Sequence, residues 1–212
     1  MGRKHRLLLG FAFGCVTAIW LPAPAYGPHH PSVTQVSPDD ETYEVYSAAI
    51  RELYLNEDEK AEGSTAMEPL VVIRDRTTSP RWGTQMFSVK MSLITGISID
   101  SETIEDLHRK SKNAIHLEPR FEFAAKQVLI GDEEFFSFFG GTGGDWPGFF
   151  ERYPTSVGWV SLSPVGFNRD HNEALLYIAR HCGFLCGEGY SVALVKNGGA
   201  WSVKGKFLLW VS

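Results

Sequence analysis

Two cysteines near the end of the sequence, Cys182 and Cys186, form its clearest chemical motif. A glycine follows each cysteine, and glycine permits the backbone angles that a tight chain reversal needs. The short spacing brings the two thiols within reach of a disulfide across a turn. His181 and the thiols would suit zinc, but a structural zinc site takes four ligands, and a redox pair more often has the spacing Cys-x-x-Cys. We therefore expect a structural disulfide and no metal or cofactor, with free thiols and a metal site as the alternatives.

Arginine and aromatic side chains suggest a second kind of chemistry, the binding of an anion or a glycan. Arg74 and Arg76 follow the apolar run 70–73, which predicts a buried strand that emerges into solvent. Arg152 and Tyr153 form a similar pair further along the chain. Structural ion pairs would explain these residues equally well.

Residues 133–150 are unusually aromatic, with a glycine cluster at 140–144. A phosphate-binding loop would need Gly-Lys-Ser/Thr after the glycines, whereas Asp145 follows here. The pattern predicts two short aromatic helices that are joined by a mobile loop and pack on a sheet. The alternative is a stacking platform for an apolar ligand or a glycan, with Trp146 as a candidate binding residue.

The sequence lacks three motifs that are typical of hydrolases. It contains no Gly-x-Ser-x-Gly, Ser-x-x-Lys or His-Glu-x-x-His. Ser156 or Ser163 with His171 or His181 would make a hydrolase only if folding brought them together. Polar residues near Tyr153, Asn168 and His171 are the candidates for that chemistry and, equally, for ligand binding.

The first residues have the layout of a secretory signal peptide. Three basic residues precede the uncharged stretch 7–21, and Ala23-Pro24-Ala25 supplies small residues for cleavage before Tyr26. An uncleaved anchor, or lipid modification at Cys15, are the alternatives. We therefore expect a signal peptide at 1–25, a flexible leader at 26–37 and a soluble protein exported to the periplasm or the medium, with no transmembrane segment in the mature chain.

The composition limits the class of protein and of partner. The 212 residues carry a formal net charge of -5, and nucleic-acid binding needs clustered positive charge, so no nucleic-acid partner is expected. An extracytoplasmic protein or a glycan is a possible partner. The hydrophobic fraction of 43% is sufficient for one folded domain over 38–212.

Periodicity predicts an α+β fold with helices and short strands upstream of a C-terminal four-strand antiparallel meander. Ser37 is the expected N-cap of the first helix, and Trp201, Val203, Phe207, Leu209 and Val211 should share the core face of the last strand. The expected upstream elements are helices at 38–55 and 100–112 and strands at 70–73, 87–93 and 121–129. The expected C-terminal strands are 160–167, interrupted at Pro164, 174–178, 190–194 and 201–211.

Several short motifs resemble a family of uncharacterised exported bacterial proteins. They are Tyr153-Pro154-Thr155-Ser156-Val157-Gly158, Leu162-Ser163-Pro164-Val165-Gly166-Phe167-Asn168, Ala174-Leu175-Leu176-Tyr177, Cys182-Gly183, Cys186-Gly187-Glu188-Gly189-Tyr190, Trp201 and Trp210-Val211-Ser212. The similarity is densest over 146–212. It implies export and a bacterial source, and it transfers no catalytic residue.

Taken together, the sequence favours a ligand- or partner-binding module over an enzyme. A small extracytoplasmic hydrolase and a structural module of an envelope assembly are the alternatives.

Overall fold

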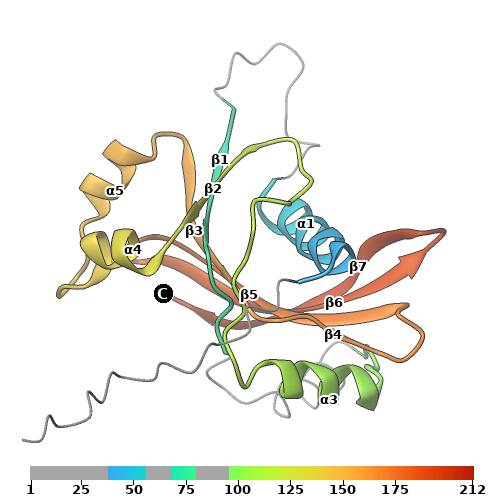
Figure 1. Cartoon of the computed structure of the whole chain (residues 1–212). Coiled ribbons are helices and arrows are strands. Elements are labelled where there is room, and N and C mark those ends of the chain that lie inside the picture. Colours follow the sequence, from blue (N-terminus) through green and yellow to red (C-terminus); the bar gives the residue numbers. More distant parts are fainter. Residues whose placement is uncertain (1–37, 56–67, 80–95) are drawn as a thin grey trace, which may run out of the picture. The chain divides into compact units, whose positions relative to one another are not determined.

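A mixed sheet organises the residues that the structure, a computed structural model, describes: 38–55, 68–79 and 96–212 (Figure 1). The helices of these ranges are α1 (Asp40–Tyr54), α3 (Ser101–Lys110), α4 (Asp132–Phe139) and α5 (Trp146–Arg152). Their strands are β1 (Leu70–Arg74), β2 (Lys126–Ile130), β3 (Ser156–Leu162), β4 (Gly166–Phe167), β5 (Glu173–Gly183), β6 (Cys186–Asn197) and β7 (Ala200–Val211). The predicted signal peptide at 1–25, the leader at 26–37 and the strand at 87–93 lie outside the described residues. None of the described helices is both long and apolar enough to cross a membrane.

The strand order is β2-β1-β3-β5-β6-β7, with β4 also paired to β5. The strands from β3 to β7 pair antiparallel, whereas β1 pairs in parallel with both β2 and β3. The predicted α+β class and the antiparallel C-terminal strands are therefore confirmed. The sheet does not end there, because β1 and β2 extend it as parallel neighbours.

The first helix begins later than the sequence suggests. Asp39 is the N-cap, and its carboxylate accepts a hydrogen bond from Thr42 N at 2.9 Å. Asp40 and Glu41 occupy the first turn, where acidic side chains interact favourably with the helix dipole. The expectation of an N-cap at Ser37 is thus corrected to Asp39.

The predicted strand at 121–129 is also shorter, and β2 starts only at Lys126. The residues before it bond to α1 instead of to a strand. Glu122 N donates to Ser47 Oγ at 2.8 Å, and Arg51 donates to Glu122 O at 2.5 Å. Phe121 is buried against α1, so its burial comes from helix contact and not from sheet pairing.

Alternate residues of the central strands face opposite sides of the sheet, as the period of a strand requires. Residues such as Val71, Val160 and Leu176 form one core with α1. On the other side, Leu175 packs with α3, and Val72 packs with α4 and α5 in a separate aromatic cluster. The sheet therefore has α1 on one face and the other three helices on the opposite face.

The last strand does not keep one face towards one core. Trp201 and Val203 belong to the core with α1, whereas Phe207 packs on the α3 side. The β6–β7 register shifts between Ala193 and Leu194 and again between Gly189 and Tyr190, and each bulge adds a residue to β7. An extra residue moves every later side chain to the opposite face, so the expectation of one shared face is wrong. Val211 is 68% exposed.

Candidate functional site

Aromatic side chains from five elements surround a cavity of about 370 Å³ at one end of β5. We call it the aromatic pocket, and it is lined by Phe139, Gly143, Gly144, Trp146, Trp159, His181, Gly183, Phe184, Trp210 and Ser212. Figure 1 shows the C-terminal end of β7 beside α4 at this end of the sheet. The volume lies within the range of small-molecule sites, ~300–1,000 Å³.

Trp159 and His181 form the centre of the pocket wall. They are directly opposite residues of β3 and β5, and their rings stack with centroids 4.1 Å apart and planes inclined by 13°. The preceding residue, Gly158, has φ +102° and brings β3 close to the backbone of His181 and Cys182. A side chain at 158 would overlap His181 O, so the close approach of these two strands depends on glycine.

Trp210 of β7 continues the row of rings. Its centroid lies 5.0 Å from that of His181, and its Nε1 donates to Tyr177 Oη at 2.9 Å. The indole lies over two glycines of β6, since a Cβ at Gly187 or Gly189 would collide with it. Glycine spacing on one strand therefore makes the space for the aromatic ring of the next strand.

The predicted disulfide closes the hairpin beside this wall. Cys182 and Cys186 are bonded, with Cα atoms 5.0 Å apart, at the turn between β5 and β6. Phe184 in that turn is 65% exposed and lies at the pocket, close to Gly143 of the glycine segment. The disulfide thus restrains one edge of the pocket.

The aromatic segment at 133–150 forms the opposite side. It contains the two predicted helices, α4 and α5, and Asp145 caps α5 by accepting from Gly148 N at 3.0 Å. Trp146 is only 8% exposed and packs on Phe139 with ring centroids 4.9 Å apart. The candidate binding residue Trp146 therefore lines the pocket mainly as part of its packed base.

The electrostatics of the pocket are simple. Among its described lining residues there is no lysine, arginine, aspartate or glutamate. Burial lowers the pKa of His181 to about 4, so the imidazole is neutral at physiological pH. A neutral imidazole offers one hydrogen-bond donor and one acceptor.

The three arginines that the sequence suggested for anion or glycan binding each contact a carboxylate. Arg74 pairs with Asp132 at 2.5 Å and lies 3.7 Å from the centroid of Phe135, and Arg76 approaches the same carboxylate at 4.0 Å. Arg152 lies 3.6 Å from Glu134, to which Tyr153 also donates its hydroxyl proton. Burial and the Glu134 hydrogen bond raise the pKa of Tyr153 to about 12. These arrangements are ion pairs around the aromatic cluster of α4 and α5.

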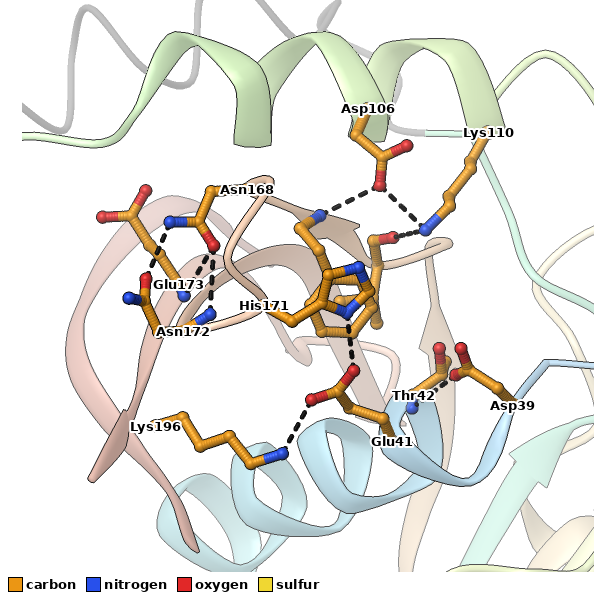
Figure 2. Close-up of polar contacts among 12 residues, drawn as sticks. Asp39, Glu41, Thr42, Asp106, Lys110, Asn168, His171, Asn172, Glu173 and Lys196 are labelled. Atoms are coloured by element: carbon orange, nitrogen blue, oxygen red, sulfur yellow. Dashed lines mark hydrogen bonds and ion pairs between the residues drawn. The ribbon is translucent and has the colours of Figure 1, made fainter. Parts of the chain in front are cut away.

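Asn168 and His171 lie together in the turn between β4 and β5, at the other end of β5 from the aromatic pocket (Figure 2). Asn168 Oδ1 accepts from Asn172 N at 3.0 Å and from Glu173 N at 3.1 Å, which fixes the turn. His171 stacks on Phe167 with centroids 5.0 Å apart. The structure therefore brings Asn168 and His171 together and places Tyr153 elsewhere.

Glu41 of α1 holds this turn. One carboxylate oxygen lies 2.6 Å from His171 Nδ1, and the other accepts from Lys196 Nζ at 2.8 Å (Figure 2). Burial acts to raise the pKa of Glu41, but the hydrogen bonds with Lys196 and His171 outweigh it and the pKa is lowered. The contact joins α1 to β6 and to the turn.

A second cavity, of about 620 Å³, lies between this turn and α3. Four of its charged residues form ion pairs: Asp106 lies 2.8 Å from Lys110, and Arg169 lies 2.8 Å from Glu102. Burial acts to raise the pKa of Asp106, but hydrogen bonds from Lys110 and from Phe167 N lower it overall. The hydrogen bond from Phe167 N to Asp106 and the ion pair of Arg169 with Glu102 connect α3 to β4 and to the turn that follows it.

The serines weighed for catalysis have other hydrogen-bond partners. Ser163 is fully buried, donates to Pro164 O at 2.7 Å and accepts from Tyr177 N at 2.8 Å. Ser156 Oγ donates to Gly158 O at 2.8 Å and accepts from Gly158 N at 3.0 Å. Within the described ranges, no group of three or more histidine, cysteine or acidic residues is placed to hold a metal ion.

The sequence did not predict that Trp159, His181 and Trp210 lie together in one site. They come from three strands, and their assembly depends on register. The signals in the sequence were Gly158 before Trp159 and the glycine pair 187 and 189, which are typical of close backbone or ring approach.

Comparisons with protein-family models, with curated proteins and with solved structures gave no match.

Proposed function

We propose that this chain is an exported binding protein whose aromatic pocket takes an uncharged ligand with a flat face. The observation that carries the proposal is the row of three rings, Trp159, His181 and Trp210, in a pocket without charged side chains. Aromatic faces bind flat ligands by stacking, and a pocket without lysine or arginine gives an anionic ligand no counter-charge. The disulfide is compatible with an oxidising compartment, as is the signal-peptide pattern of residues 1–25.

The resemblance to exported bacterial proteins supports the same proposal. Its glycine, cysteine and tryptophan motifs supply Gly158, Gly187, Gly189, Cys182, Cys186 and Trp210, all of which shape or line the pocket. In this proposal the C-terminal strands form the expected four-strand meander, and the aromatic pocket lies at one end of it.

Binding is favoured over hydrolysis by the placement of the candidate residues. Tyr153 donates to Glu134 beside α4, whereas His171 contacts Glu41 near α1, at the opposite end of β5. In the described ranges His181 interacts through its ring faces, and the hydrogen bonds of Ser156 and Ser163 are to backbone atoms. General-base catalysis would need a base within hydrogen-bond reach of a nucleophile.

Indole is a suitable neutral, flat probe for a calorimetric titration. We expect the wild-type protein to bind it and Trp210→Ala to bind it about tenfold more weakly or worse, because the indole side chain forms one wall. Leu208→Ala is the matched control, since Leu208 lies on the same strand, is 45% exposed and does not line the pocket. Equal affinities for both variants would refute the proposal. Phe184 and Leu185 are the exposed residues of the turn between β5 and β6. Binding of a protein partner at this turn, without binding of any flat neutral probe, would favour the envelope-assembly alternative.

A further inference from the structure

We propose that the ligand of the aromatic pocket is a neutral saccharide. This inference rests on the proposed function and adds the chemical class of the ligand. Three features of the pocket carry it: rigidly held aromatic rings, imidazole nitrogens without hydrogen-bond partners, and the absence of charged side chains.

The ring faces suit the carbon–hydrogen face of a sugar ring. Trp210 is held flat by Gly187 and Gly189 beneath it and by its hydrogen bond to Tyr177 Oη at 2.9 Å. Trp159 is held by the stack on His181 and by an edge contact with Phe135, whose centroid lies 4.9 Å away. Fixed aromatic walls bind with little loss of side-chain entropy, because the rings are ordered before the ligand arrives.

The polar atoms distinguish a sugar from a purely apolar ligand. Within the described part of the chain the ring nitrogens of His181, a lining residue of the pocket, have no hydrogen-bond partner. An acyl chain or a hydrocarbon ring would cover the imidazole and leave its donor and acceptor unsatisfied, which is costly. A sugar has hydroxyl groups at its rim, so one hydroxyl can donate to the unprotonated imidazole nitrogen and another can accept from the ring N–H. Ser212 supplies a further hydroxyl at the pocket.

The absence of charge distinguishes a neutral sugar from an acidic or phosphorylated one. The nearest charged side chains along the hairpin, Arg180 and Glu188, are directly opposite residues of β5 and β6 and pair with each other at 2.8 Å. Arg180 is therefore already neutralised by a carboxylate. A uronic acid or a sugar phosphate would enter a pocket without lysine or arginine side chains, where no cation replaces its hydration.

The roles of the residues follow from these features. Trp210 and Trp159 provide the stacking surfaces, and His181 is the hydrogen-bonding residue between them. The turn closed by Cys182–Cys186 keeps Phe184 at the edge of the pocket.

Isothermal titration of the full chain with cellohexaose, maltohexaose, hexa-N-acetylchitohexaose and hexagalacturonate tests the inference, with indole as a separate probe. We expect at least one neutral hexasaccharide to bind, and hexagalacturonate to bind about tenfold more weakly or not at all. His181→Phe keeps an aromatic ring in the stack but removes both polar atoms. It should weaken saccharide binding about tenfold and weaken indole binding much less, because phenylalanine keeps a ring in the stack and loses only the two nitrogens.

The outcomes separate the two proposals. Indole binding that depends on Trp210 without binding of any neutral hexasaccharide would overturn the saccharide inference and leave the proposed function standing. Saccharide binding that is unchanged in His181→Phe, or stronger for hexagalacturonate, would overturn it as well. If neither indole nor any of the saccharides binds, both the saccharide inference and the proposed function are overturned. If His181→Phe does not fold, as judged by thermal unfolding, His181→Leu also removes both polar atoms and has a smaller side chain.

Discussion

Replacing Gly189 by alanine tests the architecture of the pocket wall. The new Cβ would overlap the indole of Trp210, with Cε2 at 2.6 Å and Cδ1 at 2.9 Å and with Nε1 as the third overlapping atom. All three atoms belong to one side chain, so the indole must move for the methyl group to fit. Its movement would break the Nε1 hydrogen bond to Tyr177.

The size of the effect follows from these two changes. Forcing a methyl group into a packed site costs about 1–3 kcal/mol. Loss of the hydrogen bond adds about 1 kcal/mol. Gly189→Ala should therefore lower the free energy of unfolding by about 2–4 kcal/mol. It should also weaken indole binding, because Trp210 no longer lies in the pocket wall.

A double-mutant cycle with Trp210→Ala isolates the cause. When the Trp210 side chain is absent, the new methyl group displaces nothing. Gly189→Ala in the Trp210→Ala background should therefore lower the free energy of unfolding by less than about 1 kcal/mol. Denaturant unfolding of the four proteins measures the coupling. Gly141→Ala is the control, since Gly141 has no atom within 4 Å of an added Cβ and should change stability by less than about 0.5 kcal/mol. If Gly189→Ala lowers the free energy of unfolding equally in the wild-type and the Trp210→Ala backgrounds, the reasoning is refuted.

Three further predictions concern acid, reduction and the last strand. The pKa of His181 is lowered from 6.5 to about 4, so the folded protein binds fewer protons than the unfolded chain between these values, and its unfolding free energy should fall as pH drops through that window. The loss is at most about 3 kcal/mol and, discounted for partial exposure, about 1–2 kcal/mol. Denaturant unfolding at several pH values should show a steeper slope in the wild type than in His181→Phe. Reduction of Cys182–Cys186 should cost about 2 kcal/mol and increase amide hydrogen exchange only at the β5–β6 turn, and exchange spread over the whole sheet would contradict a local role. Phe207→Ala should cost about 2–3 kcal/mol and increase exchange in α3, not α1, because Phe207 packs on the α3 side; thermal unfolding and exchange together check this.

The parts of the fold that local chemistry determines could be predicted from the sequence. The Cys182–Cys186 pair followed from spacing and flanking glycines, and the disulfide at the turn is confirmed. The helix at 101–110 followed from Asp100, whose side chain accepts from Glu102 N at 2.9 Å. Both depend on residues within a few positions of each other, where propensity and spacing carry the information.

The pocket itself depends on register, which local patterns do not specify. Trp159 meets His181 because β3 and β5 pair antiparallel at that position, and Trp210 reaches the same site only after two bulges in β7. A bulge changes which face a side chain occupies, so simple alternation placed Phe207 on the wrong face. The parallel pairing of β1 with β2 and β3 is likewise set by contacts distant in sequence.

The most direct measurement for the proposed binding site is an NMR titration that follows the indole N–H signals of the six tryptophans. Trp159 and Trp210 line the aromatic pocket, whereas Trp201 is buried in the core beside α1. Addition of a neutral hexasaccharide or of indole should shift the signals of Trp159 and Trp210 and leave that of Trp201 in place. A shift of Trp201 without the other two, or no shift with any neutral ligand, would contradict the account.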